Sequence, residues 1–157
     1  MGKSTPATTA LARAGVSHRL HEYTLTEDGD SYGEAVAAAL GVDPARLFKT
    51  LIAEVDGKPV VGIVPVSGRL STKALARAAG GKRARLADGA TAERLTGYVV
   101  GGISPFGRKR GLPVFVDRSV TDFETVFVSA GMRGLQVEID PQAFSNLLAA
   151  SLHDLAE

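Results

Sequence analysis

The stretch Thr96-Gly-Tyr-Val-Val-Gly-Gly-Ile-Ser-Pro-Phe-Gly107 is the most informative part of this 157-residue chain. A short apolar run leads into two glycines, a hydroxyl and a proline. Gly101 and Gly102 permit positive φ and a close approach of the backbone to a ligand, and Pro105 restricts Ser104 to extended conformations. Such a loop can direct N–H groups at a carbonyl oxygen or an anion, although a plain turn after a strand has the same composition.

Outward from this loop, cap signals predict the helices. A Ser, Thr or Asp side chain accepts hydrogen bonds at a helix start, and a glycine commonly ends the helix. The predicted helices run from Thr5-Pro6 to Gly15, from the capping box Ser31-Tyr-Gly-Glu34 to about Leu40, from Ser71 to Gly80-Gly81, from Asp88 to Gly97, and onward from Asp140-Pro141, with one helical turn opened by Asp43-Pro44. Glu27 to Asp30 is a polar loop.

Runs rich in β-branched and aromatic residues predict the strands. The predicted strands are 19–24, 48–55, 60–66, a short one near 83–86, 98–100, 114–116, 125–128 and 135–139. Asp56-Gly57 predicts a hairpin turn, and Ser129 to Gly134 predicts a second turn. Because hairpins mix with crossovers, the pattern predicts a mixed α/β fold, a sheet flanked by helices, and not a doubly wound sheet. The length suits a single domain over residues 1–157.

Composition excludes several classes of site. The net charge is +1, so any contact with nucleic acid must be a local basic patch. The absence of cysteine excludes disulfides, a thiol nucleophile and thiolate metal ligands, and it fits a cytoplasmic protein. We expect no membrane span and no signal peptide. His18 and His21 lack accompanying carboxylates at metal spacing and are expected to be surface residues, so no metal and no cofactor are expected.

Lys49 is the most distinctive single residue in the predicted strands. Side chains alternate along a strand, so Lys49 shares its face with Leu51, Ala53 and Val55. A lysine on such a face either extends from the end of the sheet into water or points into a cavity. In a cavity it would be suited to bind a phosphate or polarise a carbonyl.

Other candidate groups are ambiguous by themselves. Tyr23 and Tyr32 flank a polar loop and could line a pocket or pack in the core. Arg108, Lys109 and Arg110 follow the glycine loop, and Lys82, Arg83 and Arg85 form a second basic group. Both groups could neutralise phosphates or be ordinary solvated charges.

Familiar catalytic motifs are missing from the sequence. There is no phosphate-binding P-loop, no Gly-x-Gly-x-x-Gly after a strand and no Gly-x-Ser-x-Gly elbow. No Ser/His/Asp set can be assembled, and no pair of carboxylates is marked as an acid and a base. An enzyme with this sequence would therefore depend on positioning and on backbone donors.

Four segments together resemble the YbaK/EbsC family of free-standing Cys-tRNA(Pro) deacylases, which are related to the editing domain of bacterial prolyl-tRNA synthetases. The segments are Phe48-Lys-Thr-Leu51, Gly97 to Gly107, Leu112-Pro113 and Val128-Ser-Ala-Gly-Met-Arg-Gly-Leu135. The similarity covers nearly the whole chain. It implies a curved, largely antiparallel mixed sheet of about six to seven strands surrounded by helices.

The resemblance also implies a set of site residues. Lys49 and Gly101 are the expected catalytic positions, and tRNA contacts are expected from Arg108, Lys109, Arg110, Lys82 and Arg83. The expected substrate-binding residues are Tyr23, Tyr32, Thr50, Gly102, Ile103, Ser104, Pro105, Ser129 and Gln136. One position departs from the family pattern, because Gln136 stands where relatives often have Asp. Any role of an acidic group there is in doubt.

The implied reaction is hydrolysis of mischarged Cys-tRNA(Pro), in which the substrate's own thiol attacks its ester. The enzyme then needs no nucleophile of its own. The expected partners are tRNA(Pro) charged with Cys and prolyl-tRNA synthetase, and the sequence leaves the oligomeric state open. Two alternatives remain: a deacylase for Ala-tRNA(Pro) or another small aminoacyl-tRNA, in which water attacks, and a non-catalytic module that binds tRNA or a synthetase.

Overall fold

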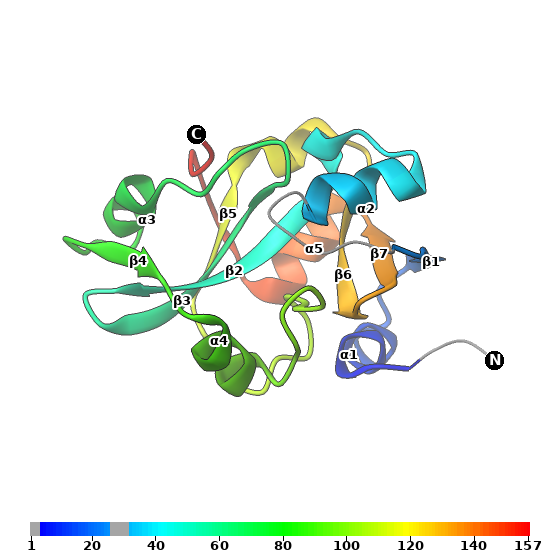
Figure 1. The fold of residues 1–157 in the computed structure, drawn as a ribbon, viewed down its shortest axis with the longest axis horizontal. Helices are drawn as coiled ribbons and strands as arrows, with labels where there is room; N and C mark the ends of the chain where they lie inside the picture. Colours follow the sequence, from blue (N-terminus) through cyan, green and yellow to red (C-terminus); the bar gives the residue numbers. More distant parts are fainter. Residues whose placement is uncertain (1–3, 26–31) are drawn as a thin grey trace.

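The computed structural model describes residues 4–25 and 32–157, and the strands in these residues form two sheets (Figure 1). The three-stranded sheet has the order β1 (His18–Glu22), β7 (Leu135–Ile139), β6 (Val126–Met132). The five-stranded sheet has the order β4 (Ala84–Leu86), β2 (Phe48–Val55), β3 (Lys58–Pro65), β5 (Val114–Asp117), β8 (Ser151–His153). An isolated parallel bridge between Leu47 and Phe127 links the two sheets.

Helices occupy the positions that the cap residues predict. They are α1 (Pro6–Ala14), α2 (Tyr32–Leu40), α3 (Thr72–Ala78), α4 (Gly89–Thr96) and α5 (Pro141–Leu148), with 3-10 turns η1 (Pro44–Arg46) and η2 (Arg118–Asp122). The side chains of Thr5, Ser71, Asp88 and Asp140 each accept a backbone N–H at a helix start. Ser31 of the predicted capping box and the loop 27–30 lie outside the described residues.

Strand directions are mixed, which confirms the predicted α/β class. The β2–β3 hairpin is antiparallel and turns at Asp56-Gly57, where both residues have positive φ. The pairs β3–β5 and β5–β8 are parallel, and the other pairs are antiparallel. The structure divides the strands into two sheets, whereas the sequence predicts a single curved one.

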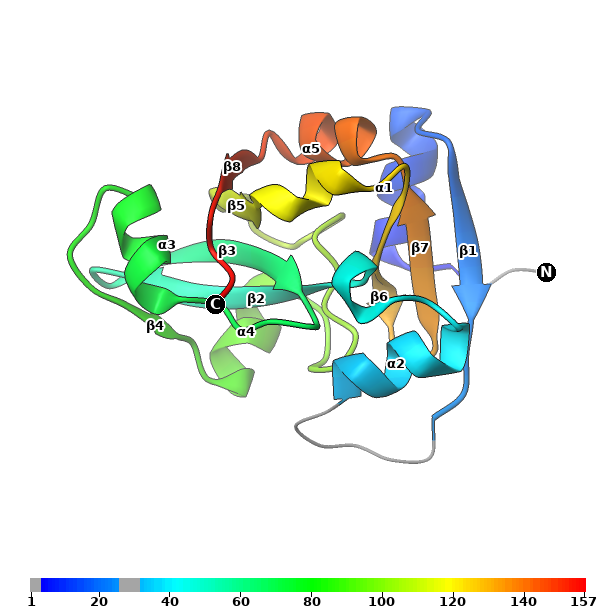
Figure 2. The ribbon, with the colours of Figure 1, turned by 90° about the horizontal axis from the view of Figure 1, so that it is seen from above.

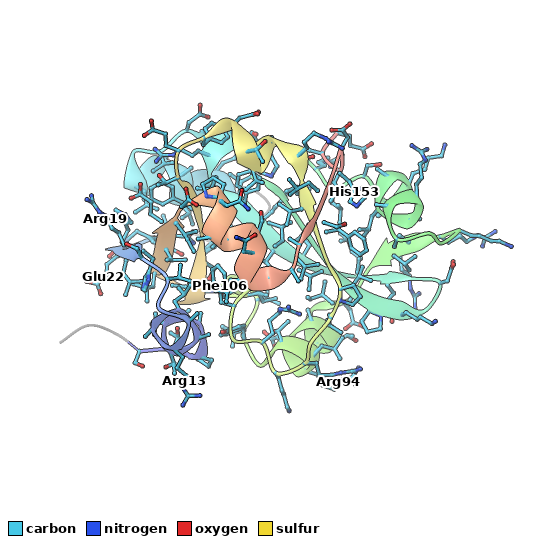
Figure 3. The ribbon with its side chains drawn as sticks, turned by 180° about the vertical axis from the view of Figure 1, so that it is seen from behind. Arg13, Arg19, Glu22, Arg94, Phe106 and His153 are labelled. Carbon is cyan, nitrogen blue, oxygen red and sulfur yellow. The ribbon has the colours of Figure 1, made fainter. Side chains whose placement is uncertain are left out.

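The segment between α4 and β5, which contains the glycine loop, runs between the two sheets (Figures 1 and 2). In both views α1 and α2 lie on opposite sides of the three-stranded sheet. One buried core joins both sheets to this segment, since Ile63, Val128 and Phe106 all belong to it. The Phe106 ring meets the ring of Phe144 on α5 edge-on, with 5.8 Å between ring centroids (Figure 3).

The predicted strand at Tyr98 to Val100 is wrong. Gly97 ends α4 in a left-handed conformation, and a turn follows in which the Gly102 N–H donates to the Val99 carbonyl, at 2.9 Å. Tyr98 is buried and its hydroxyl donates to the Phe106 carbonyl, so the segment closes on itself and pairs with no strand. Local β-propensity is overridden here by this tertiary contact.

Two further boundaries differ from the prediction. The predicted turn from Ser129 to Gly134 is shorter, because β6 continues through an irregularity to Met132 and only Arg133-Gly134 turns the chain. The sequence contains no signal for β8, whose residues Ser151–His153 pair in parallel with β5.

His21 lies on β1, where its Nε2 is 2.9 Å from Glu138 Oε1.

Candidate active site

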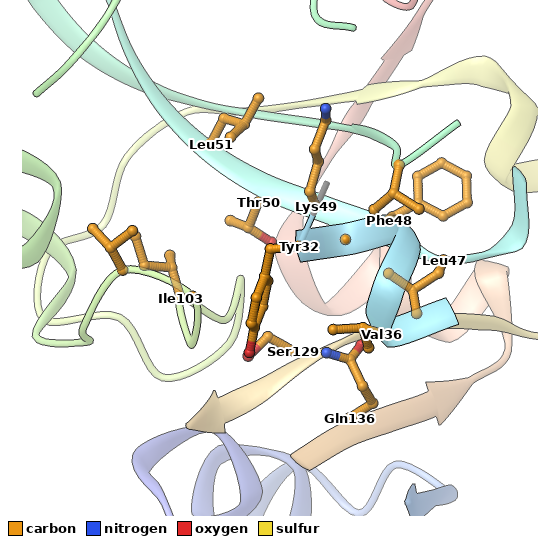
Figure 4. Close-up of a pocket in the computed structure, with 14 residues that line it drawn as sticks. Tyr32, Val36, Leu47, Phe48, Lys49, Thr50, Leu51, Ile103, Ser129 and Gln136 are labelled. Carbon is orange, nitrogen blue, oxygen red and sulfur yellow. The ribbon is translucent and has the colours of Figure 1, made fainter. Parts of the chain in front are cut away.

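A pocket of about 260 Å³ opens between the start of β2, the start of α2 and the glycine loop (Figure 4). Its lining includes seven of the predicted site residues, namely Tyr32, Lys49, Thr50, Gly101, Ile103, Ser129 and Gln136. The rest of the lining is mostly apolar: Gly33, Val36, Leu47, Phe48, Leu51, Val66 and Val100. Segments that are far apart in the chain therefore line one pocket.

Two buried polar atoms in this lining have no hydrogen-bond partner among the described residues. They are Oγ1 of Thr50 and Oε1 of Gln136. Burial without a partner costs about 1–3 kcal/mol per group, so folded proteins seldom leave such atoms unpaired without a reason. Because both residues line the pocket, a ligand that reached these atoms and hydrogen-bonded to them would recover this free energy.

Lys49 is half-exposed, and its ammonium points away from Gln136 (Figure 4). Burial lowers the pKa of Lys49, and the nearby Arg69 lowers it further, while Glu34 acts in the opposite direction. The lysine thus lies at the edge of the pocket as a partly desolvated cation. That is a suitable place for a phosphate or a developing negative charge.

The glycine loop packs against the turn between β6 and β7. Gly101 has a φ of +92°, and a Cβ added to it would lie 2.5 Å from Nε of Arg133. A Cβ on Gly102 would lie 2.8 Å from Cα of Met132. Gly102 is therefore required by close packing against the backbone of Met132 and Arg133, and Gly101 is favoured by its positive φ and in addition lines the pocket.

Several predicted substrate-binding residues do not line the pocket. Ser104 is fully buried, and its hydroxyl accepts from the N–H of Phe106 at 3.2 Å. Gly102 and Pro105, which belong to the same loop, are buried and do not line the pocket. Tyr23 supports the wall from outside, with its hydroxyl 3.2 Å from that of Tyr32.

Comparison with known proteins places the chain in a family. Residues 26–147 match the family model described as the aminoacyl-tRNA editing domain. The chain belongs to the aminoacyl-tRNA editing domain family. Members of this kind act as deacylases, since editing removes a wrong amino acid by cleaving its ester to tRNA, and the chain is an enzyme of this class.

Two sequence relatives of this editing domain span most of its length. EbsC of Enterococcus faecalis, a candidate Cys-tRNA(Pro)/Cys-tRNA(Cys) deacylase, is 35% identical over 147 residues, which are 92% of this chain and 88% of EbsC. YwhH of Bacillus subtilis, an uncharacterised protein, is 29% identical over 128 residues, or 82% of each chain.

Solved structures share the fold of the editing domain. A candidate trans-editing enzyme for prolyl-tRNA synthetase superposes with a TM-score of 0.87 at 23% identity, over 99% of both chains. The hypothetical protein APE2540 superposes with a TM-score of 0.86 at 25% identity, over 98% of this chain and all of the other. The arrangement of two linked sheets is therefore common to these proteins.

The basic groups predicted to bind tRNA occupy different places in this editing domain. Arg108 is half-buried, and its guanidinium donates to the carbonyls of Pro105 and Arg110, so it fixes the loop itself. Burial lowers the pKa of Arg108. Lys109 and Arg110 are exposed.

Lys82 and Arg83 lie at the far end of the β2–β3 hairpin, where their N–H groups donate to the carboxylate of Asp56. A strand rises roughly 3.3 Å per residue, so about 20 Å of β2 separates Lys49 from this end. Lys82 and Arg83 therefore lie away from the pocket, and Arg108, Lys109 and Arg110 are not among its lining residues.

Sequence reasoning missed two cations beside the pocket of the editing domain. Arg133 lies over the ring of Tyr32, with its guanidinium carbon 5.7 Å from the ring centroid, and Arg69 is near enough to Lys49 to affect its pKa. Both are isolated arginines in glycine-containing turns, so their neighbours could not be inferred from local sequence. Within residues 4–25 and 32–157, no helix has the length and apolar character of a membrane span, and no group of metal-ligating side chains gathers.

Proposed function

We propose that this protein is a trans-editing deacylase that hydrolyses Cys-tRNA(Pro), with residues 1–157 acting as one editing domain. The observation that carries the proposal is the chemistry of the pocket. Its described lining contains no carboxylate, imidazole or thiol, so among the described lining residues the hydroxyls of Ser129 and Thr50 have no carboxylate or imidazole beside them to act as a base. A substrate that carries its own nucleophile needs no such base.

The proposed reaction is an intramolecular substitution. The sulfur of the cysteinyl group, as its thiolate, attacks the ester carbonyl carbon and a new S–C bond forms. The C–O bond to the terminal ribose then breaks, and the proton lost from the thiol is returned through solvent to the ribose oxygen. The products are free tRNA and a four-membered cyclic thioester, which water opens to cysteine.

In this reaction the protein acts by positioning and electrostatics. Lys49, at the pocket edge, is placed to neutralise negative charge on the ester oxygen or on the terminal phosphate. Backbone groups of the loop at Gly101 would orient the aminoacyl ester. Thr50 and Gln136 would hydrogen-bond to the polar end of the amino acid, because their buried oxygens have no partner in the described protein.

The size of the pocket suits a small aminoacyl group. Its volume of about 260 Å³ lies below the roughly 300–1,000 Å³ of sites for larger ligands. The terminal adenosine and the acceptor stem would therefore remain outside the pocket. Lys109 and Arg110, which are exposed, would attract the acceptor stem, and a prolyl-tRNA synthetase would contribute to the choice of tRNA in the cytoplasm.

A deacylation assay with matched substrates tests the proposal. Purified protein is incubated separately with Cys-tRNA(Pro), Ala-tRNA(Pro) and Pro-tRNA(Pro), and loss of the ester is compared with loss in buffer. Alanine is smaller than cysteine and lacks the thiol, so we expect cleavage of the cysteinyl ester and little of the alanyl ester. Equal cleavage of both would contradict thiol attack and favour attack by water.

The non-catalytic alternative has a distinct outcome in the same experiment. If the protein binds charged tRNA but accelerates no ester loss at saturating protein, it is a binding module.

A further inference from the structure

The turn between β6 and β7 makes contact with two walls of the pocket at once. Nε of Arg133 donates to the carbonyl of Val100 at 3.0 Å, which fixes the start of the glycine loop. The same guanidinium lies over the ring of Tyr32, the first residue of α2, at 5.7 Å from the ring centroid. Val100 and Tyr32 both line the pocket, so a single side chain spans the gap between its walls.

Steric contacts make this connection tight. A Cβ on Gly101 would lie 2.5 Å from Nε of Arg133, far closer than two such atoms can approach. Gly134, with a φ of +92°, closes the turn, and its carbonyl accepts from the N–H of Tyr23 at 3.0 Å. The hydroxyl of Tyr23 in turn lies 3.2 Å from that of Tyr32.

A guanidinium suits both of these contacts. Its planar group can donate from an edge to a carbonyl while its face lies against an aromatic ring. A lysine ammonium is a point charge without a flat face, so it cannot make both contacts in the same geometry. Arg133 is exposed, so its contacts add little to stability, and their main effect is to fix one wall of the pocket relative to the other.

We propose that Arg133 is a positioning residue for deacylation: it holds the Gly101 backbone at a fixed distance from Tyr32, with the aminoacyl ester between them. This inference rests on the proposed function, because it assumes that the ester occupies this pocket. Its consequence is kinetic. A reacting group displaced by about 1 Å can lose ~10²-fold in rate, whereas binding of the rest of the tRNA is unaffected.

Kinetics of Arg133→Met and Arg133→Lys test the role, with Arg13→Met as the matched control. We expect both Arg133 variants to lower kcat for Cys-tRNA(Pro) by about 10- to 100-fold and to change KM less than threefold. If Arg133 instead only attracts tRNA phosphates, Arg133→Lys restores activity, and the loss in Arg133→Met falls on KM and varies with salt. That result would overturn the proposal.

A double-mutant cycle tests the contact without any substrate. Gly101→Ala introduces strain from its positive φ and a clash with Arg133, and Arg133→Ala removes the clash alone. We expect Gly101→Ala to lower the urea midpoint of unfolding less in the Arg133→Ala background than in the wild type. Equal effects in both backgrounds would show that the two residues do not interact and would refute the proposal. This measurement holds even if the wild-type protein cleaves neither Cys- nor Ala-tRNA, so failure of the proposed function is recognised separately.

Discussion

Thr50 and Gln136 come from different sheets, yet both line the same pocket, and each has a buried side-chain oxygen without a hydrogen-bond partner in residues 4–25 and 32–157. Thr50 lies on β2 of the five-stranded sheet and Gln136 on β7 of the three-stranded sheet. The bridge from Leu47, just before β2, to Phe127 on β6 links the two sheets, and Gln136 pairs with Ser129 on β6. Leaving these two polar groups unpaired costs free energy in the free protein, and under the proposed function a bound substrate would offset that cost.

Replacing Thr50 with valine should therefore separate stability from activity. Valine has nearly the same shape and lacks the unpaired hydroxyl, so we expect Thr50→Val to raise the free energy of unfolding by up to about 1 kcal/mol. The same change removes a hydrogen bond to substrate and should lower kcat/KM by about 10-fold. Urea unfolding and the deacylation assay measure the two effects.

Thr96→Val is the matched control for this prediction. Thr96 is also buried, but its hydroxyl donates to the carbonyl of Ala92 at 2.8 Å and accepts from the N–H of Tyr98. Its loss should destabilise the protein by about 1 kcal/mol. A Thr50→Val variant that loses stability like Thr96→Val, with unchanged activity, would show that Thr50 does not contact the substrate.

Lys49 gives a prediction about pH. Burial and Arg69 lower the pKa of Lys49 below its usual value, so its ammonium deprotonates earlier than an exposed lysine as the pH rises. Rising pH also produces more substrate thiolate, so we expect a bell-shaped profile of kcat/KM whose alkaline side reports Lys49. Arg keeps its charge, and Lys49→Arg should move that alkaline limb to higher pH.

Lys49→Ala should lower kcat/KM by about 10²-fold and remove the alkaline limb. The rate of ester loss in buffer is subtracted at each pH, because aminoacyl esters hydrolyse unaided in base. Lys58→Ala is the control, since Lys58 is an exposed lysine at the far end of the same hairpin. An alkaline limb that persists in Lys49→Ala would assign it to another group.

Ser104 tests whether the loop acts through side chains or through its backbone. The Ser104 hydroxyl is fully buried and accepts from Phe106 N–H, on the side of the loop away from the pocket. We expect Ser104→Ala to retain at least half of the wild-type kcat and to lose about 1 kcal/mol of stability. A large loss of kcat with unchanged stability would instead place this hydroxyl at the substrate.

Sequence patterns predict the parts of this fold that depend on contacts between residues close together in the chain. The caps at Thr5, Ser71 and Asp88 could be predicted because each side chain bonds to an N–H three residues away. The strand expected at Tyr98 to Val100 failed, because its conformation depends on the hydroxyl contact of Tyr98 with Phe106. The polar strand β8 forms only because β5 offers a free edge.

In the candidate site, too, the sequence could predict some residues, whereas others depend on contacts between distant segments. Lys49, Thr50 and Gly101 could be proposed from motif order, and the structure brings them into one pocket. Arg133 lies in one of the motif segments but is not among the predicted site residues, because its contacts to Val100 and Tyr32 join segments that are distant in the chain. The tRNA contact expected of Arg108 rests on its charge and on its position after the glycine loop, and it stays a prediction; the structure shows that its guanidinium donates to the Pro105 carbonyl within that loop.

Asp117 gives a prediction about acid stability. Burial by itself raises the pKa of Asp117, but hydrogen bonds from the Ser119 hydroxyl and from the N–H groups of Leu155 and Ala156 outweigh it, so the pKa is lowered overall. A carboxyl whose pKa is lower in the folded than in the unfolded state stabilises the fold above about pH 4, the unfolded pKa. That stabilisation is lost as the pH falls through the folded pKa.

Asp117→Asn should therefore lower the free energy of unfolding by about 1.5–3 kcal/mol at pH 7, since the amide N–H₂ would face the Ser119 donors. The difference from wild type should shrink as the pH is lowered from 5 to 3, because the wild-type carboxylate becomes protonated. Urea unfolding at several pH values measures it. Asp154→Asn is the control, because Asp154 is exposed and its ion pair with Arg118 should contribute little. A stability difference that stays constant across this pH range would mean that Asp117 acts through shape and not through its charge.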